Sequence, residues 1–297
     1  MLTARAFLSD HRIVGLIVPL TDAQWARIEP LLPDRTPRRG GRWRDHRQVI
    51  DAIAWKFQTG SQWVHLPAEY GSWKGVYTRL RNWAIDGTWE RVFTALLAQA
   101  DADGDLDWVV AVDSTIVRVH QNGAGARKKG PAAEPTDHAI GRSRGGLTTK
   151  VHLAADSRCR PLCFVLTPGQ AGDAPTFEHV MAAIRVPRRV GRPRVRPFAV
   201  LADKAYSSRA IRDHLRRRGV RAVIPQPADQ IANRKRKGRG GGRPPGFDRD
   251  AYKQRNTVER CINRLKQWRG LATRYEKTAT VYRAGLLIAG IFLWSAR

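Results

Sequence analysis

Two short apolar runs in this sequence each end in an aspartate. The first is VVAVD at residues 109–113, and the second is AVLAD at residues 199–203. Runs of this length and β-branched content are typical of buried strands. Open α/β sheets place their sites at the carboxyl ends of neighbouring strands, so we expect Asp113 and Asp203 to lie close together. Two adjacent carboxylates raise each other's pKa or recruit a cation, and hard oxygen ligands favour Mg²⁺ or Mn²⁺.

The segments around these two runs predict a mixed α/β sheet with flanking helices over residues 105–297. Strand-like runs come first and then alternate with helical patterns, which is typical of such a sheet. Residues 234–246, RKRKGRGGGRPPG, predict a basic flexible segment without fixed structure in the absence of a partner. The expected strands are 108–113, 149–156, 162–168, 196–203 and 220–226, and the expected helices are 173–185, 207–219, 250–268 and 280–295.

Residues 21–104 predict a small all-α domain, which follows a poorly determined lead-in at 1–20. Thr21 and Gln24 have the spacing of a capping box, which predicts a helix start. Apolar residues at helical spacing predict three more helices, from 48 to 60, from 73 to 84 and from 88 to 100.

The helix from 73 to 84 is the second helix of a candidate helix-turn-helix. Its apolar face contains Val76, Leu80 and Trp83, and we expect the tryptophans of this region to be core residues. The remaining positions hold residue types that reach phosphates and base edges in a major groove. These candidate DNA-binding residues are Lys74, Thr78, Arg79, Arg81 and Asn82.

The charge of the chain favours a polyanionic partner. It has 53 Lys and Arg against 26 Asp and Glu, a formal net charge of +27. Nucleic acid is the first expectation, because each neutralised phosphate releases condensed counterions. A membrane is the less favoured partner, since the longest apolar runs are far shorter than the roughly 20 residues of a bilayer-spanning helix. Cys159, Cys163 and Cys261 lack zinc-type pairing and no secretion signal is evident, so we expect reduced thiols and a cytoplasmic location.

The helix expected over 250–268 presents a third acid. On this helix Tyr252, Arg255, Glu259 and Lys266 form one narrow stripe, beside an apolar stripe of Val258, Ile262 and Leu265. Glu259 therefore borders the core. The plain alternative is a salt-bridged helix edge, which would contribute only about 0.3 to 0.5 kcal/mol per pair.

Over nearly its whole length the chain resembles the DDE transposases of bacterial insertion sequences, in the four/five superfamily (insertion-sequence five-like). The similar segments include LTDAQWARIEPLLP, AVDSTIVRVHQ, GRSRGGLTTKVHLAAD and LADKAY. The most specific one is YKQRNTVERCINRLKQW, which has the family's Y-x2-R-x3-E-x6-K signature in full. The resemblance implies an RNase H-like fold, with Asp113, Asp203 and Glu259 as the metal-binding triad. It also implies that the helical domain binds the element's terminal inverted repeats.

The same resemblance implies a chemistry. Two Mg²⁺ or Mn²⁺ ions held by the triad would support hydrolysis at the transposon end and then attack of the freed 3′-hydroxyl on target DNA. Tyr252, Arg255 and Lys266 would position DNA phosphates. The implied partners are double-stranded DNA, as terminal repeats and as target, and at least one further copy of the chain. The expected place of action is the bacterial cytoplasm, in association with the nucleoid.

Other interpretations stay open at this point. His120 and His152 are expected to be structural strand residues rather than ligands. The basic run at 234–246 is either a DNA contact or a solvated loop. One alternative function is a catalytically inactive DNA-binding repressor or decayed element product. The other is a recombinase that forms a covalent protein–DNA bond, but this mechanism needs a late histidine and no histidine follows His214.

Overall fold

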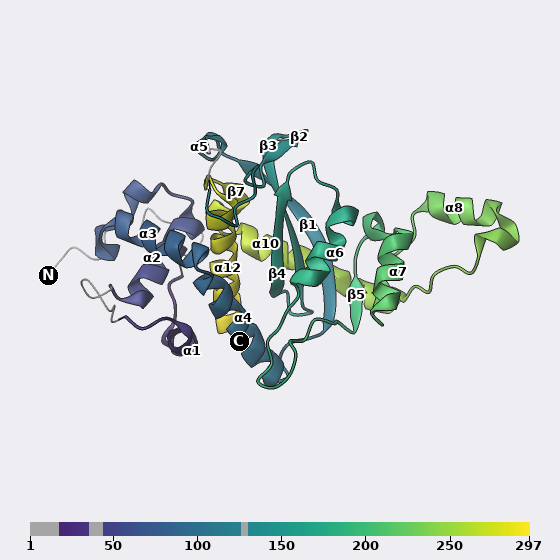
Figure 1. Cartoon of the computed structure of the whole chain (residues 1–297), viewed down its shortest axis with the longest axis horizontal. Helices are drawn as coiled ribbons and strands as arrows, with labels where there is room; N and C mark the ends of the chain where they lie inside the picture. Colours follow the sequence, from purple (N-terminus) through teal and green to yellow (C-terminus); the bar gives the residue numbers. More distant parts are fainter. Residues whose placement is uncertain (1–17, 36–43, 126–129) are drawn as a thin grey trace.

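The computed structural model describes residues 18–35, 44–125 and 130–297 (Figure 1). A mixed sheet occupies the middle of the molecule. A helical region made by the first hundred residues lies at one end of the long axis, and an arm that carries the helix α8 projects at the other end. The last long helix, α12, lies between the helical region and the sheet.

The helical region contains the four helices that the sequence predicts. The capping box at α1 is confirmed, because Thr21 Oγ1 accepts from the Gln24 amide and Gln24 Oε1 accepts from the Thr21 amide. The helix before Gly60 ends there because that residue adopts φ of 71°, which favours glycine. The elements are α1 (Asp22–Ile28), η2 (Glu29–Leu31), α2 (His46–Thr59), η3 (Trp63–His65), η4 (Ala68–Tyr70), α3 (Trp73–Ile85) and α4 (Thr88–Ala102), where η marks a 3₁₀ helix.

The sheet contains seven strands in the described part of the chain. Its main path is β2-β3-β1-β5-β6, with β4 also paired to β3 and β7 also paired to β1. β3 runs antiparallel to β1, β2 and β4, whereas β5 runs parallel to β1 and β6. The strands are β1 (Val109–Val119), β2 (Gly141–Ser143), β3 (Gly146–Ala155), β4 (Pro161–Pro168), β5 (Ala199–Leu201), β6 (Arg221–Val223) and β7 (Thr273–Arg274).

The order β4-β3-β1-β5-β6, with β3 as the antiparallel member, defines the fold. Three antiparallel strands are followed along the chain by two strands that continue the sheet in parallel, each reached through a helical connection. This is the RNase H-like arrangement, which confirms the predicted fold class. The remaining helical elements are α5 (Gln121–Ala124), α6 (Asp173–Ala183), η5 (Lys204–Tyr206), α7 (Arg209–Arg217), α8 (Ala228–Arg236), η6 (Gly238–Gly241), α9 (Arg249–Tyr252), η7 (Lys253–Arg255), α10 (Asn256–Lys266), α11 (Arg269–Ala272) and α12 (Ala279–Ser295).

Helices α6 and α10 cover opposite faces of the sheet. The neighbouring residues Asp113 and Ser114 show this, since successive side chains of a strand point to opposite faces. Asp113 contacts Arg255, which directly precedes α10, and Ser114 contacts Asp173 at the start of α6. The sheet is therefore the middle layer of a three-layer arrangement at this point.

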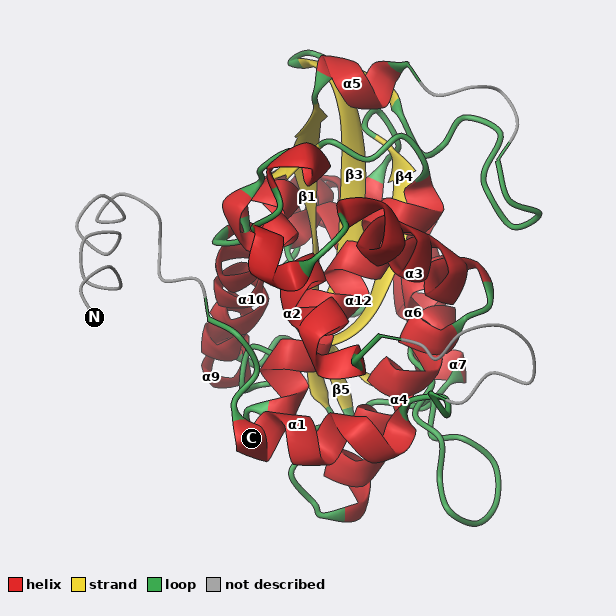
Figure 2. Cartoon of the chain, turned by 90° about the vertical axis from the view of Figure 1, so that its left-hand side faces the viewer, coloured by secondary structure: helices red, strands yellow, loops and turns green. Residues whose placement is uncertain are grey.

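Helix α12 joins the helical region to the sheet. It packs against α3 and α4 on one side and against β4 on the other, and Figure 2 shows it behind α2. One continuous hydrophobic core runs through both parts, from Leu20 to Trp294. Although α12 is strongly apolar, no helix in the described residues has the combination of length and hydropathy that a bilayer crossing requires.

Three features differ from the sequence-based expectations. β1 does not stop at Asp113 but continues to Val119, because β3 pairs with it as far as Arg118. The helix expected over 250–268 is divided into α9, η7 and α10, and hydrophobic periodicity cannot distinguish a 3₁₀ turn of three residues from continued α-helix. The connection between α2 and α3 contains η3 and η4, so it is longer than the tight turn of a typical helix-turn-helix.

The basic segment at 234–246 also differs, since it begins with regular structure. Its first residues form the last turn of α8, and the glycines that follow form η6. A side chain at Gly241 would place its Cβ 2.1 Å from the carbonyl oxygen of Arg234. The glycine run therefore allows the turn to fold back against α8.

The close approach of α12 to α2 generates a stability prediction. A Cβ at Gly285 would lie 2.5 Å from Cε1 of Phe57, whereas a Cβ at Gly75 of α3 would meet nothing within 4 Å. Gly285→Ala should lower the free energy of unfolding by about 1 to 2 kcal/mol, because overpacking outweighs the gain in helix propensity. Gly75→Ala should raise it by about 0.5 to 1 kcal/mol.

Urea denaturation followed by tryptophan fluorescence measures both variants. Shortening the opposing side chain in the double variant Phe57→Leu/Gly285→Ala should recover part of the loss. Equal stabilisation by the two glycine substitutions would show that α12 does not depend on close contact at residue 285.

Candidate active site

The register of β1 and β5 brings the first two acids to the same level of the sheet. Val109, Val110 and Ala111 lie opposite Ala199, Val200 and Leu201 in a parallel pair. Asp113 is two residues beyond Ala111, and Asp203 is two residues beyond Leu201. Since parallel neighbours rise equally per residue, both aspartates lie at the carboxyl end of the paired segment. The structure thus brings together the two acids that the sequence singled out.

Asp113 lies where β1 loses its parallel neighbour. β3 occupies one edge of β1, so β5 and β7 both pair along the other edge, at its two ends. β5 pairs with β1 as far as Ala111, and the pairing of β1 with β7 begins only at Arg118, opposite Thr273. Between these residues that edge has no strand partner in the described part of the chain. The strand therefore presents Asp113 at a gap in the sheet.

Backbone amides hold both aspartates in place. Asp113 Oδ1 accepts from the Ser114 amide at 2.8 Å. Asp203 is the N-cap of η5, and its Oδ1 accepts from the Ala205 amide at 2.9 Å. These hydrogen bonds to nearby backbone amides therefore orient each carboxylate without a ligand.

Arg255 connects the third acid to the first. Its Nη2 donates to Asp113 Oδ2 at 2.7 Å, and its Nη1 donates to Glu259 Oε1 one helical turn further on. The Arg255 side chain is 17% exposed, compared with 47% for Glu259. The Arg255 Nε is buried and has no hydrogen-bond partner among the described residues. Arg255 therefore places a cation between the carboxylates of β1 and α10.

Burial and charge both act on this group. Burial raises the pKa of Asp113, the charges of Asp203 and Glu259 raise it further, and the Ser114 amide and Arg255 oppose the shift. Burial also acts to lower the pKa of the Arg255 guanidinium, but Asp113 and Glu259 outweigh this effect and raise it. The three acids are thus close enough for their charges to interact, and the gathered negative charge favours a cation.

The donor set fits divalent metal ions, although it is not arranged as a finished site. Within the described ranges, no three Asp, Glu, His or Cys side chains are grouped closely enough to hold a metal ion. The position between Asp113 and Glu259 is instead spanned by the guanidinium of Arg255. Three carboxylates on separate elements, with a side-chain cation between two of them, have the ligand chemistry of Mg²⁺ and Mn²⁺.

Tyr252 lies near the acids, and Lys266 lies further along α10. Tyr252 is half-buried with its ring 5.2 Å from that of Phe247, and burial raises its pKa. The charges of all three acids act on its hydroxyl. Lys266 is half-buried beside Thr115 and Val117 of β1, and burial lowers its pKa. Tyr252, Arg255, Glu259 and Lys266 therefore lie along one stretch of successive helices, but Lys266 is not grouped with the other three around the acids.

A second polar network lies behind Asp113, on the other face of β1. Ser114 Oγ donates to Asp173 Oδ1 at 2.6 Å, and Lys150 Nζ donates to the same oxygen at 3.1 Å. His152 is fully buried next to them, and burial lowers its pKa to about 4. His152 is therefore neutral at physiological pH and bonds to Thr167 Oγ1 at 2.8 Å, as expected of a structural histidine.

Sequence reasoning did not assign Asp173, Ser114 or Lys150 to the site. The available signal was weak: Asp173 opens a predicted helix directly after the glycine-containing segment GQAG. Only the tertiary structure shows that this acid supports the back of the strand that carries Asp113. The other expected structural histidine, His120, caps α5 through the Asn122 amide and stacks on Tyr275.

Four of the five candidate DNA-binding residues of α3 are exposed. Lys74, Thr78, Arg81 and Asn82 face solvent, while Val76, Leu80 and Trp83 are buried as predicted. Arg79 differs from the other four because it is half-buried. Its Nη1 contacts His46 Nδ1 at 2.9 Å, and its guanidinium lies 4.9 Å from the Trp83 ring centre. Arg79 thus braces α3 against α2 instead of projecting from it.

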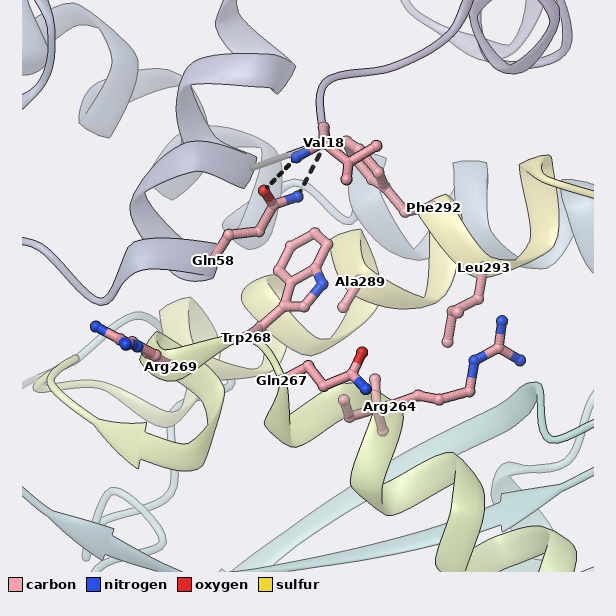
Figure 3. Close-up of a pocket in the computed structure, with 10 residues that line it drawn as sticks. Val18, Gln58, Arg264, Gln267, Trp268, Arg269, Ala289, Phe292 and Leu293 are labelled. Carbon is pink, nitrogen blue, oxygen red and sulfur yellow. Dashed lines mark hydrogen bonds between the residues drawn. The ribbon is translucent and has the colours of Figure 1, made fainter. Parts of the chain in front are cut away.

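A cavity at the junction of α10 and α12 is separate from the acids. A cavity of about 570 Å³ lies on the other side of α10, where Trp268 faces Ala289 and Phe292 of α12 (Figure 3). Gln58 closes its rim by exchanging two hydrogen bonds with the backbone of Val18. None of the three acids lines this cavity, so it belongs to the junction of the helical region with α10 and α12.

Two family models match the chain. One, described as "Putative transposase of IS4/5 family", matches residues 20–93, and the other, described as "Transposase DDE domain", matches residues 104–294. Together they span the helical region and the sheet with its flanking helices.

Relatives in two bacterial species are consistent with this match. The chain is 36% identical over 109 residues to "Uncharacterized protein y4sN" of Sinorhizobium fredii, an alignment that covers 37% of this chain and 83% of that protein. It is 30% identical over 148 residues to "Putative transposase for insertion sequence element IS6501" of Brucella ovis, covering 50% of this chain and 98% of the relative.

Among solved structures, "Crystal structure of the Mos1 Strand Transfer Complex" aligns over 79% of this chain and 82% of that chain, with 13% identity and a TM-score of 0.24. The strand order β4-β3-β1-β5-β6 defines the fold of this chain. The DDE domain model covers well over half of the sequence, and the Brucella relative is matched over almost its full length. This chain therefore belongs to the DDE transposase family of insertion sequences.

Proposed function

We propose that this chain binds the terminal inverted repeats of an insertion sequence and catalyses metal-dependent DNA cleavage and strand transfer. The observation that carries the proposal is the gathering of Asp113, Asp203 and Glu259 at one edge of an RNase H-like sheet. Their carboxylates come from a central strand, from the end of its parallel neighbour and from a helix across the sheet face. Arg255 links two of them, and the charges of the other two act on Asp113.

Asp113, Asp203 and Glu259 would hold two divalent ions, Mg²⁺ or Mn²⁺. Such ions, when bound, activate an attacking oxygen and stabilise a leaving oxygen in an in-line displacement at phosphorus. The protein holds Asp113 and Asp203 through backbone amides, which limits the cost of ordering these ligands. The network of Ser114, Asp173 and Lys150 fixes β1 from behind.

Arg255 has two roles in this proposal. In the absence of metal, its guanidinium neutralises Asp113 and Glu259. If the carboxylates held metal, Arg255 would be released from at least part of these contacts, and its planar fork would suit a DNA phosphate. Tyr252 beside the acids and Lys266 further along α10 would contact the same strand.

Recognition of the repeat is assigned to α3. Its exposed residues Lys74, Thr78, Arg81 and Asn82 include the types that contact phosphates and base edges in a major groove. We expect the chain to work as a homo-oligomer, at least a dimer on DNA, because two transposon ends must be brought together. The proposed place of action is the bacterial cytoplasm, at the nucleoid, where the DNA substrate lies.

The triad generates the first test of this function. Asp113→Asn, Asp203→Asn and Glu259→Gln should each lower cleavage of a labelled duplex carrying the element's own terminal repeat by about 1,000-fold or more, since each would remove an anionic ligand of the proposed metal ions. Asp250→Asn should not, because Asp250 is an exposed acid whose ion pair is with Lys253. Gel electrophoresis of the strands with Mg²⁺ or Mn²⁺ measures cleavage, and mobility shift without metal measures end binding.

Cleavage that needs metal and vanishes in all three triad variants, with end binding retained, is the expected result. Triad variants that cleave as well as wild type would refute the assignment. A wild-type protein that binds the repeat and never cuts it would favour the inactive repressor. Activity that survives removal of all divalent metal would favour the recombinase with a covalent intermediate.

Arg255 generates a second test, which needs no DNA. Arg255→Gln removes the cation that competes with metal for Asp113 and Glu259, so Mn²⁺ should bind about tenfold more tightly or better. Arg260→Gln is the control, because it removes an exposed arginine from the same helix next to Glu259. Titration of free Mn²⁺ by electron paramagnetic resonance gives the affinities. Unchanged or weaker binding in Arg255→Gln would show that Arg255 does not occupy the metal position.

A further inference from the structure

A strongly basic hollow lies outside the site described so far. It has a volume of about 590 Å³ and separates α7 from the arm, by which we mean residues 226–246 with α8 and η6. Six cationic residues line the hollow: Arg209, Arg212, Arg216, Arg234, Lys237 and Arg243. The arm that forms its outer wall is the part of the molecule furthest from the helical region (Figure 1).

The positive charge of this basic hollow is only partly neutralised. Asp213 is the single acid among its lining residues, and it is shared between Arg209 at 3.6 Å and Arg216 at 2.5 Å. The Arg234 Nε is buried and has no hydrogen-bond partner in the described part of the chain. The hollow therefore carries several positive charges in excess, together with an unsatisfied donor.

The inner wall is preorganised. Arg212 Nη2 donates to Ser207 Oγ at 2.8 Å and to the carbonyl of Ile224 at 2.9 Å, which fixes its side chain against the body. Ser207 Oγ also donates to Gln230 Oε1 at 3.0 Å, which ties the start of the arm to the same wall. A basic side chain held in this way loses less conformational entropy when it binds an anion than a free one does.

The outer wall has a specific shape as well. Gly241 lies so close to the Arg234 carbonyl that a Cβ would be 2.1 Å from it, and Gly238 and Gly242 adopt positive φ of 55° and 68°. These glycines fold η6 against α8 and place Lys237 and Arg243 on the hollow. A merely solvated basic loop would not need this close backbone packing.

The basic hollow adjoins the edge of the sheet that carries the acids. Ser207 follows Asp203 after the short helix η5, and Gln226 follows the carboxyl end of β6. From the arm the chain returns through α9 to Arg255 and Glu259. The residues that line the hollow thus lie in the sequence between the second and third acids. The helices α7 and α8 beside it lie at the end of the molecule opposite to α1–α3 (Figure 1).

We propose that the basic hollow binds the phosphate backbone of duplex DNA beyond the cleaved bond, on the side away from the terminal repeat. This inference rests on the proposed function and assigns a partner to a surface that the function did not use. Arginine forks and excess positive charge suit phosphates, and no base-reading element is required. Since α3 lies at the opposite end of the molecule, DNA held there and passing the acids continues toward the arm.

Binding to the backbone alone predicts a salt-dependent, sequence-independent contact. Two duplexes test it, one that ends at the terminal repeat and one that continues into a long flank of arbitrary sequence. For the wild-type chain, three phosphate contacts would weaken the flank-dependent part of the affinity about 40-fold between roughly 50 and 200 mM salt. Fluorescence anisotropy with both duplexes over a salt series gives this difference.

Two matched triple variants locate the contact. The hollow triple is Arg216→Gln, Lys237→Gln and Arg243→Gln. The control triple is Arg217→Gln, Lys235→Gln and Arg239→Gln, which removes the same charge from neighbouring positions that do not line the hollow. The hollow triple should lose the affinity gained from the flank and keep its affinity for the repeat alone. The control triple should behave as wild type.

Gly241→Ala provides an independent variant, because it changes the outer wall without removing charge. It should weaken flank binding in the same direction as the hollow triple while thermal unfolding of the chain is little changed. Equal flank binding by the hollow and control triples would overturn the inference, even if wild type cuts repeat ends. Failure of wild type to bind or cut the repeat would instead count against the proposed function itself.

Discussion

The parallel pairing of β1 with β5 is the constraint on which the site depends. It extends over three residue pairs and ends at Ala111 and Leu201. Each strand therefore carries its aspartate two residues beyond the last pair, at the same level of the sheet. The long antiparallel pairing with β3 continues beyond that point, as far as Arg118. If β5 continued alongside β1, the edge next to Asp113 would be closed by another strand. The short pairing of β1 with β5, beside the long pairing of β1 with β3, therefore leaves an open strand edge next to Asp113.

The ion pairs of Arg255 join the helix to this strand edge. Burial and the charges of Asp203 and Glu259 raise the pKa of Asp113, and a cation between Asp113 and Glu259 opposes this shift. Arg255 supplies that cation from within the chain, so α10 can approach β1 before any metal is bound. In the proposed function, metal ions would have to compete with Arg255 for these carboxylates. Assembly of the site and metal binding would then be linked through one side chain.

Helix α12 packs between the helical region and the sheet and holds the two together. Gly285 and Gly290 allow Phe57 of α2 and Phe93 of α4 to pack directly on its backbone, and the buried pair Lys56 and Glu276 lies near its start. The helical region is thereby held against the sheet, with α3 exposed at one end and the basic arm at the other (Figure 1). The two surfaces that we propose for DNA binding consequently lie at opposite ends of the molecule.

The sequence by itself determined most of the elements and singled out the candidate acids. Strand and helix periodicity located most elements and placed Asp113, Asp203 and Glu259 at strand ends and at a helix edge, because these patterns depend on local backbone geometry. Four other features depend on contacts between residues distant in sequence or on close backbone packing. They are the extension of β1 past Asp113, the inward position of Arg79, the hydrogen bond between Ser114 and Asp173, and the folding of the glycine-rich arm. Periodicity within one segment carries no information about such contacts, so only the tertiary structure could reveal them.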